Sequence, residues 1–277
     1  MNSEKTVNVV LYWVLLIALS LIFIYPLWWM VVNSLNNAAE IFGKPRLLPT
    51  SWQFSNYLRI FKVQPFGRHY INTLLVAALG TIGNVLLSAL AGYSFARIRF
   101  KGKHIAFLFL LTALMMPIEV TIVPLFFQMR KIGAYDSLFP LIMLPIFASQ
   151  GAFSTFMLRQ FYVTVPAELE EAARIDGLGA FGIFRKIMLP IALPVLSSAA
   201  ILAFISVWNT YLEPLVFINS LEKYTLPLSL TNFNDTYGLP QWNLQLAATT
   251  LSVIPIMAVY LVFQRKVSNA MVGSGLK

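Results

Sequence analysis

The feature that most constrains this chain is a series of apolar runs too long for the core of a soluble protein. The first run, from about Val9 to Val32, contains no charged residue. A helix needs roughly 20 apolar residues to cross a lipid bilayer. Only 11% of the 277 residues are charged, against about 25% in soluble domains. The chain is therefore predicted to be an all-α integral membrane protein with the bilayer as its solvent.

Six such segments are expected, separated by connectors that hold most of the polar residues. No internal repeat divides the sequence, so we expect a single transmembrane domain over residues 1–277. The predicted spans are 9–32, 70–96, 105–127, 138–158, 187–218 and 244–263, with a polar connecting loop at 164–187 and a tail at 264–277.

The net charge of +9 is placed where membrane topology explains it. Basic residues gather in short connectors, above all in the turn from Arg97 to His104, and do not form a stripe suited to nucleic acid. Cytoplasmic connectors of membrane proteins carry an excess of Lys and Arg. The termini, the basic turn and the loop at 164–187 share the more basic side. We therefore expect both termini to be cytoplasmic, and we expect no nucleic-acid partner.

The sequence offers little for catalysis or cofactor binding. It has no cysteine, and its two histidines, His69 and His104, stand at the ends of different spans. No Gly-x-x-x-x-Gly-Lys-[Ser/Thr] loop is present to hold nucleotide phosphates, and no His-Glu-x-x-His helix to hold zinc. We expect a non-catalytic chain without a metal site or cofactor of its own, whose energy comes from another subunit.

A polar segment between the fourth and fifth spans is predicted to form two short helices. Pro166 suits a first helical position, because its missing N–H would have no partner there. Gly177 can take the left-handed conformation that closes a helix. Glu170 stands four residues before Arg174, which favours an ion pair along the helix. The second helix is expected from Ala180 to Met188.

One face of the first short helix is small and apolar. A surface with so little apolar area is better suited to a partner's groove than to burial against its own bundle. An amphipathic connector resting on lipid headgroups is the alternative. The face consists of Leu169, Ala172, Ala173 and Asp176.

The same segment resembles a known family signature. Glu171-Ala172-Ala173, then Gly177, then Ile187-Met188-Leu189-Pro190 resembles the "EAA" signature of permease subunits in ATP-binding-cassette (ABC) importers, at the family spacing. In that family the loop is a coupling helix that docks into a cleft of the cytoplasmic ATPase. The resemblance implies an ATPase-coupling role for Glu171, Ala172, Ala173 and Gly177, with Leu169 and Asp176 on the same helix.

The resemblance covers nearly the whole chain. Asn72-Thr73, the run from Ala91 to Arg97, and Trp208-Asn209-Thr210-Tyr211-Leu212 are similar to the maltose-type carbohydrate permeases, and most to their shorter, MalG-like subunit. This resemblance implies the type I importer fold, in which six transmembrane helices give alternating access to a carbohydrate. It also implies a sister permease in a heterodimer, an ATPase dimer that binds ATP and Mg, an extracytoplasmic solute-binding protein, and a bacterial plasma membrane.

Polar groups within the spans are candidates for the substrate pathway, because charge inside a membrane is costly. Glu119 falls about 21 Å into the third span at 1.5 Å per residue. Glu213 stands where the family often has an apolar or aromatic residue. Aromatic and polar side chains around it suit a sugar, and an interfacial aromatic belt with helix-packing polar groups is the alternative. The candidates are Glu119, Trp208, Asn209, Tyr211 and Glu213.

Two rival functions remain open at this point. A phosphorylated polyol such as glycerol phosphate would use the same architecture, although it should require a basic cavity and no Lys or Arg lies within a span. A self-sufficient secondary transporter or channel would instead work as the isolated chain.

Asn84 and Ser88, on a stripe of small residues, are expected to form hydrogen bonds between helices and not to a ligand.

Overall fold

The computed structural model describes the backbone of residues 2–44, 46–235 and 237–274, and the side chains of 8–44, 46–235 and 237–263. Over these ranges the chain is helical, and the described part contains a single isolated bridge, Asn234 to Pro240. The residues form two compact units: Met1–Phe66 with Leu230–Ile254, and Gly67–Ser229 with Pro255–Lys277. The single domain expected over residues 1–277 stays a prediction.

The first unit is organised around the end of its long helix. It contains α1 (Asn2–Ser34), a 3-10 turn η1 (Ala38–Glu40), α2 (Ser55–Val63) and the start of α14 (Trp242–Ser274). The last carbonyls of a helix lack intrahelical donors. Buried Asn56 donates to the carbonyls of Ser34 and Asn36 at 2.9 and 3.1 Å and accepts from the Asn243 amide at 3.2 Å. One buried side chain thus ties together three segments.

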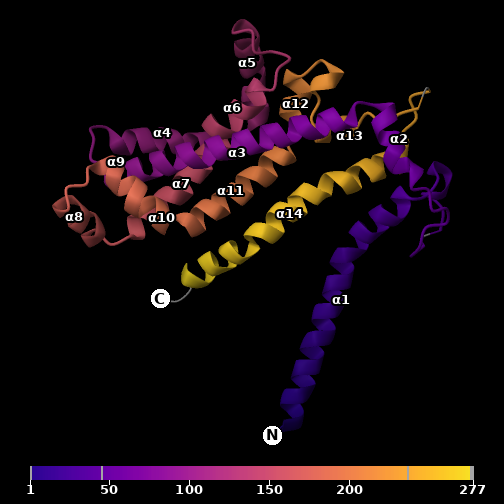
Figure 1. Ribbon diagram of the computed structural model, residues 1–277, viewed down its shortest axis with the longest axis horizontal. Helices are drawn as coiled ribbons and strands as arrows, with labels where there is room; N and C mark the ends of the chain where they lie inside the picture. Colours follow the sequence, from indigo (N-terminus) through magenta and orange to yellow (C-terminus); the bar gives the residue numbers. More distant parts are fainter. Residues whose placement is uncertain (1, 45, 236, 275–277) are drawn as a thin grey trace. The chain divides into compact units, whose positions relative to one another are not determined.

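The second unit contains the remaining helices (Figure 1), with α8 and α9 at one end of α3 and α12 at the other. They are α3 (Phe66–Arg97), α4 (Lys103–Met115), α5 (Ile118–Lys131), α6 (Phe139–Phe147), α7 (Ser149–Thr164), α8 (Glu168–Ile175), α9 (Ala180–Ile183), a π-helical segment η2 (Phe184–Met188), α10 (Leu189–Ile191), α11 (Leu193–Trp208), α12 (Leu212–Phe217), a 3-10 turn η3 (Leu221–Lys223) and α13 (Leu226–Leu230).

Helices α3 and α7 pack backbone to backbone. A Cβ atom built on Gly92 would lie 3.0 Å from the backbone nitrogen of Arg159 and 3.0 Å from the Leu158 Cβ. Along the same stripe, Asn84 donates to the carbonyl of Pro145 at 2.6 Å, and Ser88 donates to that of Gly151 at 3.1 Å. Both bonds run between helices, which confirms the prediction for these two side chains.

The described residues contain four helices that are long and apolar enough to cross a membrane, and up to six spans if each of two bent pairs is counted as one. The four are 8–34, 66–97, 139–164 and 242–263. The bent pairs are α4 with α5, at 103°, and the segment 180–191 with α11, at 77°. The described helices thus allow up to six spans, and the bounds of the predicted spans stay predictions.

Two predicted spans differ from the structure in detail. The third is not one straight helix, because α4 ends at Met115 and α5 starts beyond Pro117, whose backbone is extended. The fifth does not continue to residue 218, because α11 ends at Trp208 and a separate helix α12 follows. The tail expected from residue 264 continues α14 as far as Ser274.

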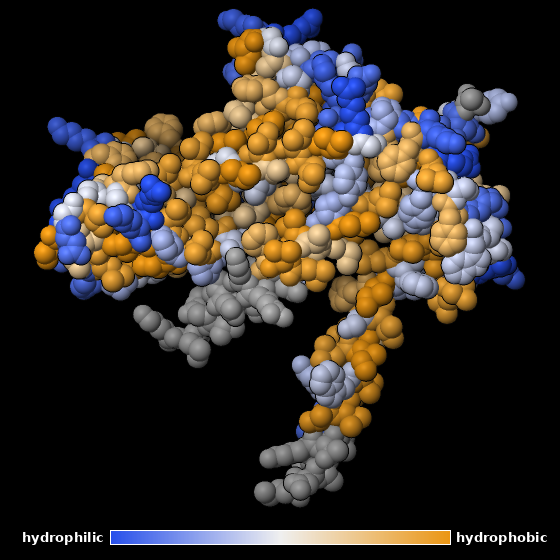
Figure 2. Space-filling view, in the orientation of Figure 1, coloured by the Kyte–Doolittle hydropathy of each residue, from blue (hydrophilic) through white to orange (hydrophobic). Residues whose placement is uncertain are grey.

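The surface of the second unit matches a lipid environment. Figure 2 shows hydrophobic residues over most of its middle, with hydrophilic residues gathered near α8 and near α5. Large exposed apolar side chains occur along α3, among them Leu74, Leu79, Ile82 and Leu86. In water such a surface would be unfavourable, whereas in a bilayer it costs nothing.

We predict that Gly92→Ala destabilises the protein in detergent, because the added methyl group meets the α7 backbone, which cannot give way as a side chain can. The expected loss is about 1–3 kcal/mol, typical of an overpacked site. Thermal unfolding measures it. Gly179→Ala is the matched control, because a Cβ at Gly179 meets nothing within 4 Å. Equal melting temperatures for both variants would contradict the close packing of α3 on α7.

Candidate coupling surface and translocation pathway

Helix α8 closes with a well-formed C-terminal cap. Gly177 has φ +81°, a left-handed conformation that glycine adopts without steric cost. Its N–H donates to the Arg174 carbonyl at 3.0 Å, and the Leu178 N–H donates to the Ala173 carbonyl at 3.0 Å. This pair of bonds is the Schellman motif, which confirms the helix end predicted at Gly177.

The start of α8 differs from the prediction. The helix begins at Glu168 with Ala167 at the N-cap, so Pro166 lies outside it and is not its first residue. The carbonyl of Ala167 accepts from the N–H groups of Glu170 and Glu171 at 2.9 and 3.1 Å. Three acidic residues fill the first turn, where the helix dipole favours negative charge.

The small apolar face predicted for α8 is divided in the structure. Ala173 is only 3% exposed and packs into a core with Tyr93, Tyr162 and Phe184. Its side chain therefore faces its own bundle, and the expectation that it faces a partner is corrected. A helix that packs against a bundle buries one of its sides, and Ala173 lies on the buried side of α8. The exposed side comprises Glu171, Ala172, Asp176, Leu169 at 43% and Ile175 at 87% exposed.

A buried carboxylate joins α8 to the end of α3. Glu170 is 4% exposed, and its Oε1 lies 3.1 Å from the Arg97 Nε. The predicted pair along the helix is confirmed, with Arg174 Nη2 at 3.6 Å from Glu170 Oε2. Arg97 also donates to the carbonyl of Val165, just before α8. The sequence analysis did not predict Arg97 as a partner of Glu170, because the two residues are far apart along the chain.

A polar cavity of about 120 Å³ lies between helices of the second unit. Glu213, at the start of α12, is the charged residue among its described lining. Hydroxyl and amide groups from α7 and α11 add hydrogen-bonding capacity beside apolar walls from α6. The lining is Ile118, Leu141, Leu144, Pro145, Ala148, Ser149, Gln150, Ser206, Val207, Thr210 and Glu213.

The five pathway candidates do not gather in one place. Trp208 is buried, stacked on Phe204 at 5.5 Å between ring centroids and edge-on to Tyr70 at 5.9 Å. Asn209 caps α11 by donating to the Ile205 carbonyl at 2.8 Å, and Tyr211 is exposed at the start of α12. Glu213 alone of the five lines the cavity.

Glu119 lies elsewhere than a straight third span would place it. It occupies the first turn of α5, immediately after the 103° bend, and is exposed. The depth of about 21 Å expected from the helical rise is therefore wrong, because that estimate assumed an unbroken helix. Helix α12, which begins next to Glu213, contacts α5, which carries Glu119. The two carboxylates belong to one region of the unit.

Four polar residues of the cavity were missed from the sequence. Ser149 and Gln150 follow the break between α6 and α7, and Ser206 and Thr210 stand four residues apart near the end of α11. The signal available in the sequence was the pair Ser206 and Thr210, two polar residues inside a long apolar run. Among the described residues, no three His, Asp or Glu side chains come together as a metal site.

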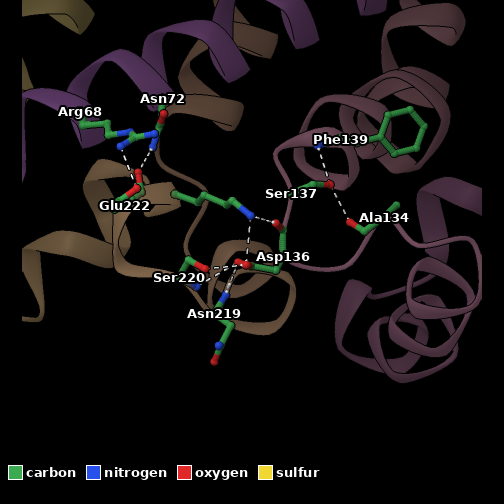
Figure 3. A network of polar contacts seen from close by, with 10 residues as sticks. Arg68, Asn72, Ala134, Asp136, Ser137, Phe139, Asn219, Ser220 and Glu222 are labelled. Carbon is green, nitrogen blue, oxygen red and sulfur yellow. Dashed lines mark hydrogen bonds and ion pairs between the residues drawn. The ribbon is translucent and has the colours of Figure 1, made fainter.

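At the end of α3 opposite to α8, two loops are locked by Asp136 (Figure 3). Its carboxylate accepts from the N–H groups of Asn219 and Ser220, both at 2.9 Å, and from the Ser220 hydroxyl at 2.6 Å. Lys223 Nζ lies 3.1 Å from the same carboxylate. Asp136 has φ +53°, a left-handed conformation that Asp tolerates better than most residues. The carboxylate thus fixes the loop after α12.

The first turns of α3 hold the same loop. Asn72 donates to the carbonyls of Glu222 and Tyr224 at 2.9 and 3.0 Å. The Thr73 hydroxyl accepts from the Leu226 N–H at 2.7 Å, and His69 Nε2 lies 2.8 Å from the Leu221 carbonyl oxygen. Arg68 pairs with Glu222 at 2.8 Å (Figure 3). Loop 219–226 is therefore bonded both to α3 and to Asp136.

This fold and this surface define a class: a multi-pass α-helical membrane protein that presents a short, capped helix between two spans. Residues 84–273 match the family described as binding-protein-dependent transport system inner membrane component. The chain belongs to that family. Its members are transport components that work with a solute-binding protein and an ATPase.

Individual relatives align along most of the chain. The diacetylchitobiose uptake system permease protein NgcG of Streptomyces coelicolor is 32% identical, over 92% of this chain and 85% of its own length. The arabinooligosaccharides transport system permease protein AraQ of Halalkalibacterium halodurans is 30% identical, over 99% of each chain. The sn-glycerol-3-phosphate transport system permease protein UgpE of Yersinia pestis is 33% identical, over 94% and 95%.

A solved structure has the same fold. A chain of a bacterial ABC transporter involved in the import of the acidic polysaccharide alginate superposes with a TM-score of 0.81 at 24% identity, covering 96% of this chain and 98% of that one. The six-span importer permease fold expected from the sequence is thereby confirmed.

We predict that Asp136→Asn lowers the melting temperature at neutral pH, and that the deficit depends on pH in a defined way. The Ser220 hydroxyl and N–H groups, with the Asn219 N–H and Lys223, hold the pKa of Asp136 well below its ordinary value. A carboxyl whose pKa is depressed by folding stabilises the protein above its unfolded pKa of about 3.9, and this stabilisation is lost as pH falls through the folded pKa.

Melting temperatures of wild type and Asp136→Asn should therefore differ by a constant amount from pH 8 down to about pH 5, above the pH at which the unfolded carboxyl begins to protonate. The gap should narrow only in stronger acid. The exposed Glu168→Gln variant controls for general loss of negative charge. A gap that closes already near neutral pH would show that Asp136 is not held ionised by these donors.

Proposed function

We propose that this chain is the transmembrane permease subunit of an ATP-driven importer for a carbohydrate, an oligosaccharide or disaccharide. One observation carries the proposal: α8 exposes Glu171 and its neighbours while Gly177 closes the helix, so a docking element stands free at the end of the bundle. Its family supplies the expectation that such an element receives force from an ATPase.

The transport cycle follows from this arrangement. A cytoplasmic ATPase dimer closes on ATP and Mg and draws α8 of this subunit towards the corresponding helix of a sister permease. The movement opens a central cavity outwards to a docked solute-binding protein, and hydrolysis resets it. This chain contributes no catalytic group in the scheme. Both termini and α8 lie on the cytoplasmic side of a bacterial plasma membrane, in agreement with the basic turn 97–104.

Several observations support a carbohydrate as cargo. One relative is named for diacetylchitobiose uptake and another for arabinooligosaccharide transport. The polar cavity combines a carboxylate with hydroxyl and amide side chains and an apolar wall. Sugar hydroxyls bond to the polar groups, and the sugar ring covers the apolar ones. Glu213 is the residue proposed to contact substrate here, with Glu119 on the neighbouring helix α5, while Trp208 holds the end of α11 in place.

A phosphorylated polyol is the second candidate cargo, because one relative is named for glycerol 3-phosphate. Its phosphate would need a cationic partner. No Lys or Arg is among the described residues that line the polar cavity, and Glu213 would repel an anion. A sister permease would have to supply the positive charge, so the structure of this chain favours an uncharged sugar.

Reconstitution tests the proposal directly. We predict that proteoliposomes with this chain, its sister permease, the ATPase and the solute-binding protein accumulate a neutral oligosaccharide only when ATP is present. The same vesicles without the ATPase should show no uptake under any ion gradient. Uptake by this chain alone would identify a secondary transporter or channel. A binding protein that prefers a phosphorylated polyol would replace the carbohydrate assignment.

We predict that Glu171→Lys and Gly177→Pro each leave membrane insertion intact and uncouple transport from ATP hydrolysis. Lysine reverses a charge on the docking face, and proline cannot adopt the φ of +81° at residue 177. ATP-driven uptake should fall at least about tenfold, equivalent to ~1.4 kcal/mol of lost coupling. Gly179→Ala, outside the cap, serves as the control. Wild-type uptake by either variant would refute the coupling role of α8.

A further inference from the structure

Helix α8 contacts the end of α3 through few buried residues. Helix α8 buries few apolar groups against its own bundle, Ala173 being the buried apolar residue of the helix. The other buried residue is Glu170. A carboxylate deprived of water requires a paired charge, and Arg97 at the last position of α3 supplies it at 3.1 Å. The contacts that α8 makes with the bundle therefore consist of the burial of Ala173 and of the Arg97–Glu170 ion pair, while the other oxygen of Glu170 lies 3.6 Å from Arg174 Nη2 within the same helix.

The pair also fixes the chain that leads into α8. Arg97 donates through its Nη2 to the carbonyl of Val165, between the end of α7 and the start of α8. One guanidinium group thus holds both the linker and the first turn of the helix. Arginine suits this task, because its planar group presents several donors in a fixed geometry.

Helix α3 can carry a displacement of α8 from this contact along its whole length. It has 32 residues without an internal proline, about 48 Å at 1.5 Å per residue. The spans built from α4 with α5 and from residues 180–191 with α11 are instead bent by 103° and 77°. At its far end, α3 is bonded to loop 219–226 through Asn72, Thr73 and His69.

We propose that the Arg97–Glu170 ion pair makes α8 and α3 move as one body, so that α3 carries a displacement of α8 to loop 219–226 and the reverse. Arg97 and Glu170 are then positioning residues, which act through α3 and touch neither ATP nor substrate. The inference rests on the proposed function, in which α8 receives the movement of the ATPase and loop 219–226 lies on the outer side. It makes α3 the link between ATPase and binding protein.

The first test uses Arg97→Gln and Glu170→Gln in the complete importer. Each should assemble and keep basal ATP hydrolysis. Each should lose the stimulation of hydrolysis by the solute-binding protein, and transport should fall by about 5- to 150-fold, the range of typical couplings between sites. Arg99→Gln is the matched control, because Arg99 is exposed two residues further on. Arg97→Lys keeps the charge but not the planar group, and should retain part of the stimulation.

The second test replaces the ion pair by a covalent bridge. The chain has no cysteine, so Arg97→Cys with Glu170→Cys, in a complex whose partners are also cysteine-free, provides two unique thiols. Before treatment this variant should be uncoupled. A bifunctional methanethiosulfonate reagent that spans the two thiols should restore transport, and reduction should abolish it again. Basal ATP hydrolysis should stay the same in the bridged and reduced states, whereas a purely structural loss of α8 would lower it together with transport.

Two results would overturn the inference. One is wild-type stimulation and transport in both glutamine variants. The other is a bridged cysteine variant that stays inactive, which would mean that α3 and α8 must move relative to each other. Both require that the wild-type complex transports. Failure of the wild-type complex itself would count against the proposed function and not against the link through α3.

Discussion

A membrane interior offers no water, so each backbone group released by a break in a helix must find its partner within the protein. The second unit breaks its helices repeatedly, and it places polar side chains beside these breaks. Asn84 and Ser88 of α3 donate to carbonyls on either side of the junction between α6 and α7. The polar cavity lies at this junction, so the irregular backbone that shapes a pathway is supported by an unbroken neighbour.

The same unbroken helix is bonded near both of its ends to other elements of the unit. Near its first turns, side chains hold loop 219–226, which Asp136 fixes from the other side. At its last residue an arginine holds α8. Bent spans can change their angle at the bend, whereas a continuous helix preserves the distance between its ends. Transport by alternating access requires elements of both kinds.

Much of this structure was predictable because membrane solvation acts on local sequence. Charge-free runs predicted the spans, and Gly177 predicted the end of α8. Structural features that depend on tertiary packing could not be predicted from the sequence. Ala172 and Ala173 are alike in sequence, yet one is exposed and the other buried. Glu119 could be placed only once the bend at Pro117 was known. Arg97 read as part of a basic turn, because its partner lies 73 positions away.

The tight junction between α6 and α7 also limits how this sequence can vary. A Cβ atom on Gly151 would overlap the carbonyl oxygen of Ile146, at 1.9 Å. Every other amino acid carries that atom, so no replacement is tolerated there unless the backbone itself moves. Such a shift would displace the carbonyls that Asn84 and Ser88 bind. Sequence change at this junction is therefore confined to the side chains around residue 151, while that residue itself stays a glycine.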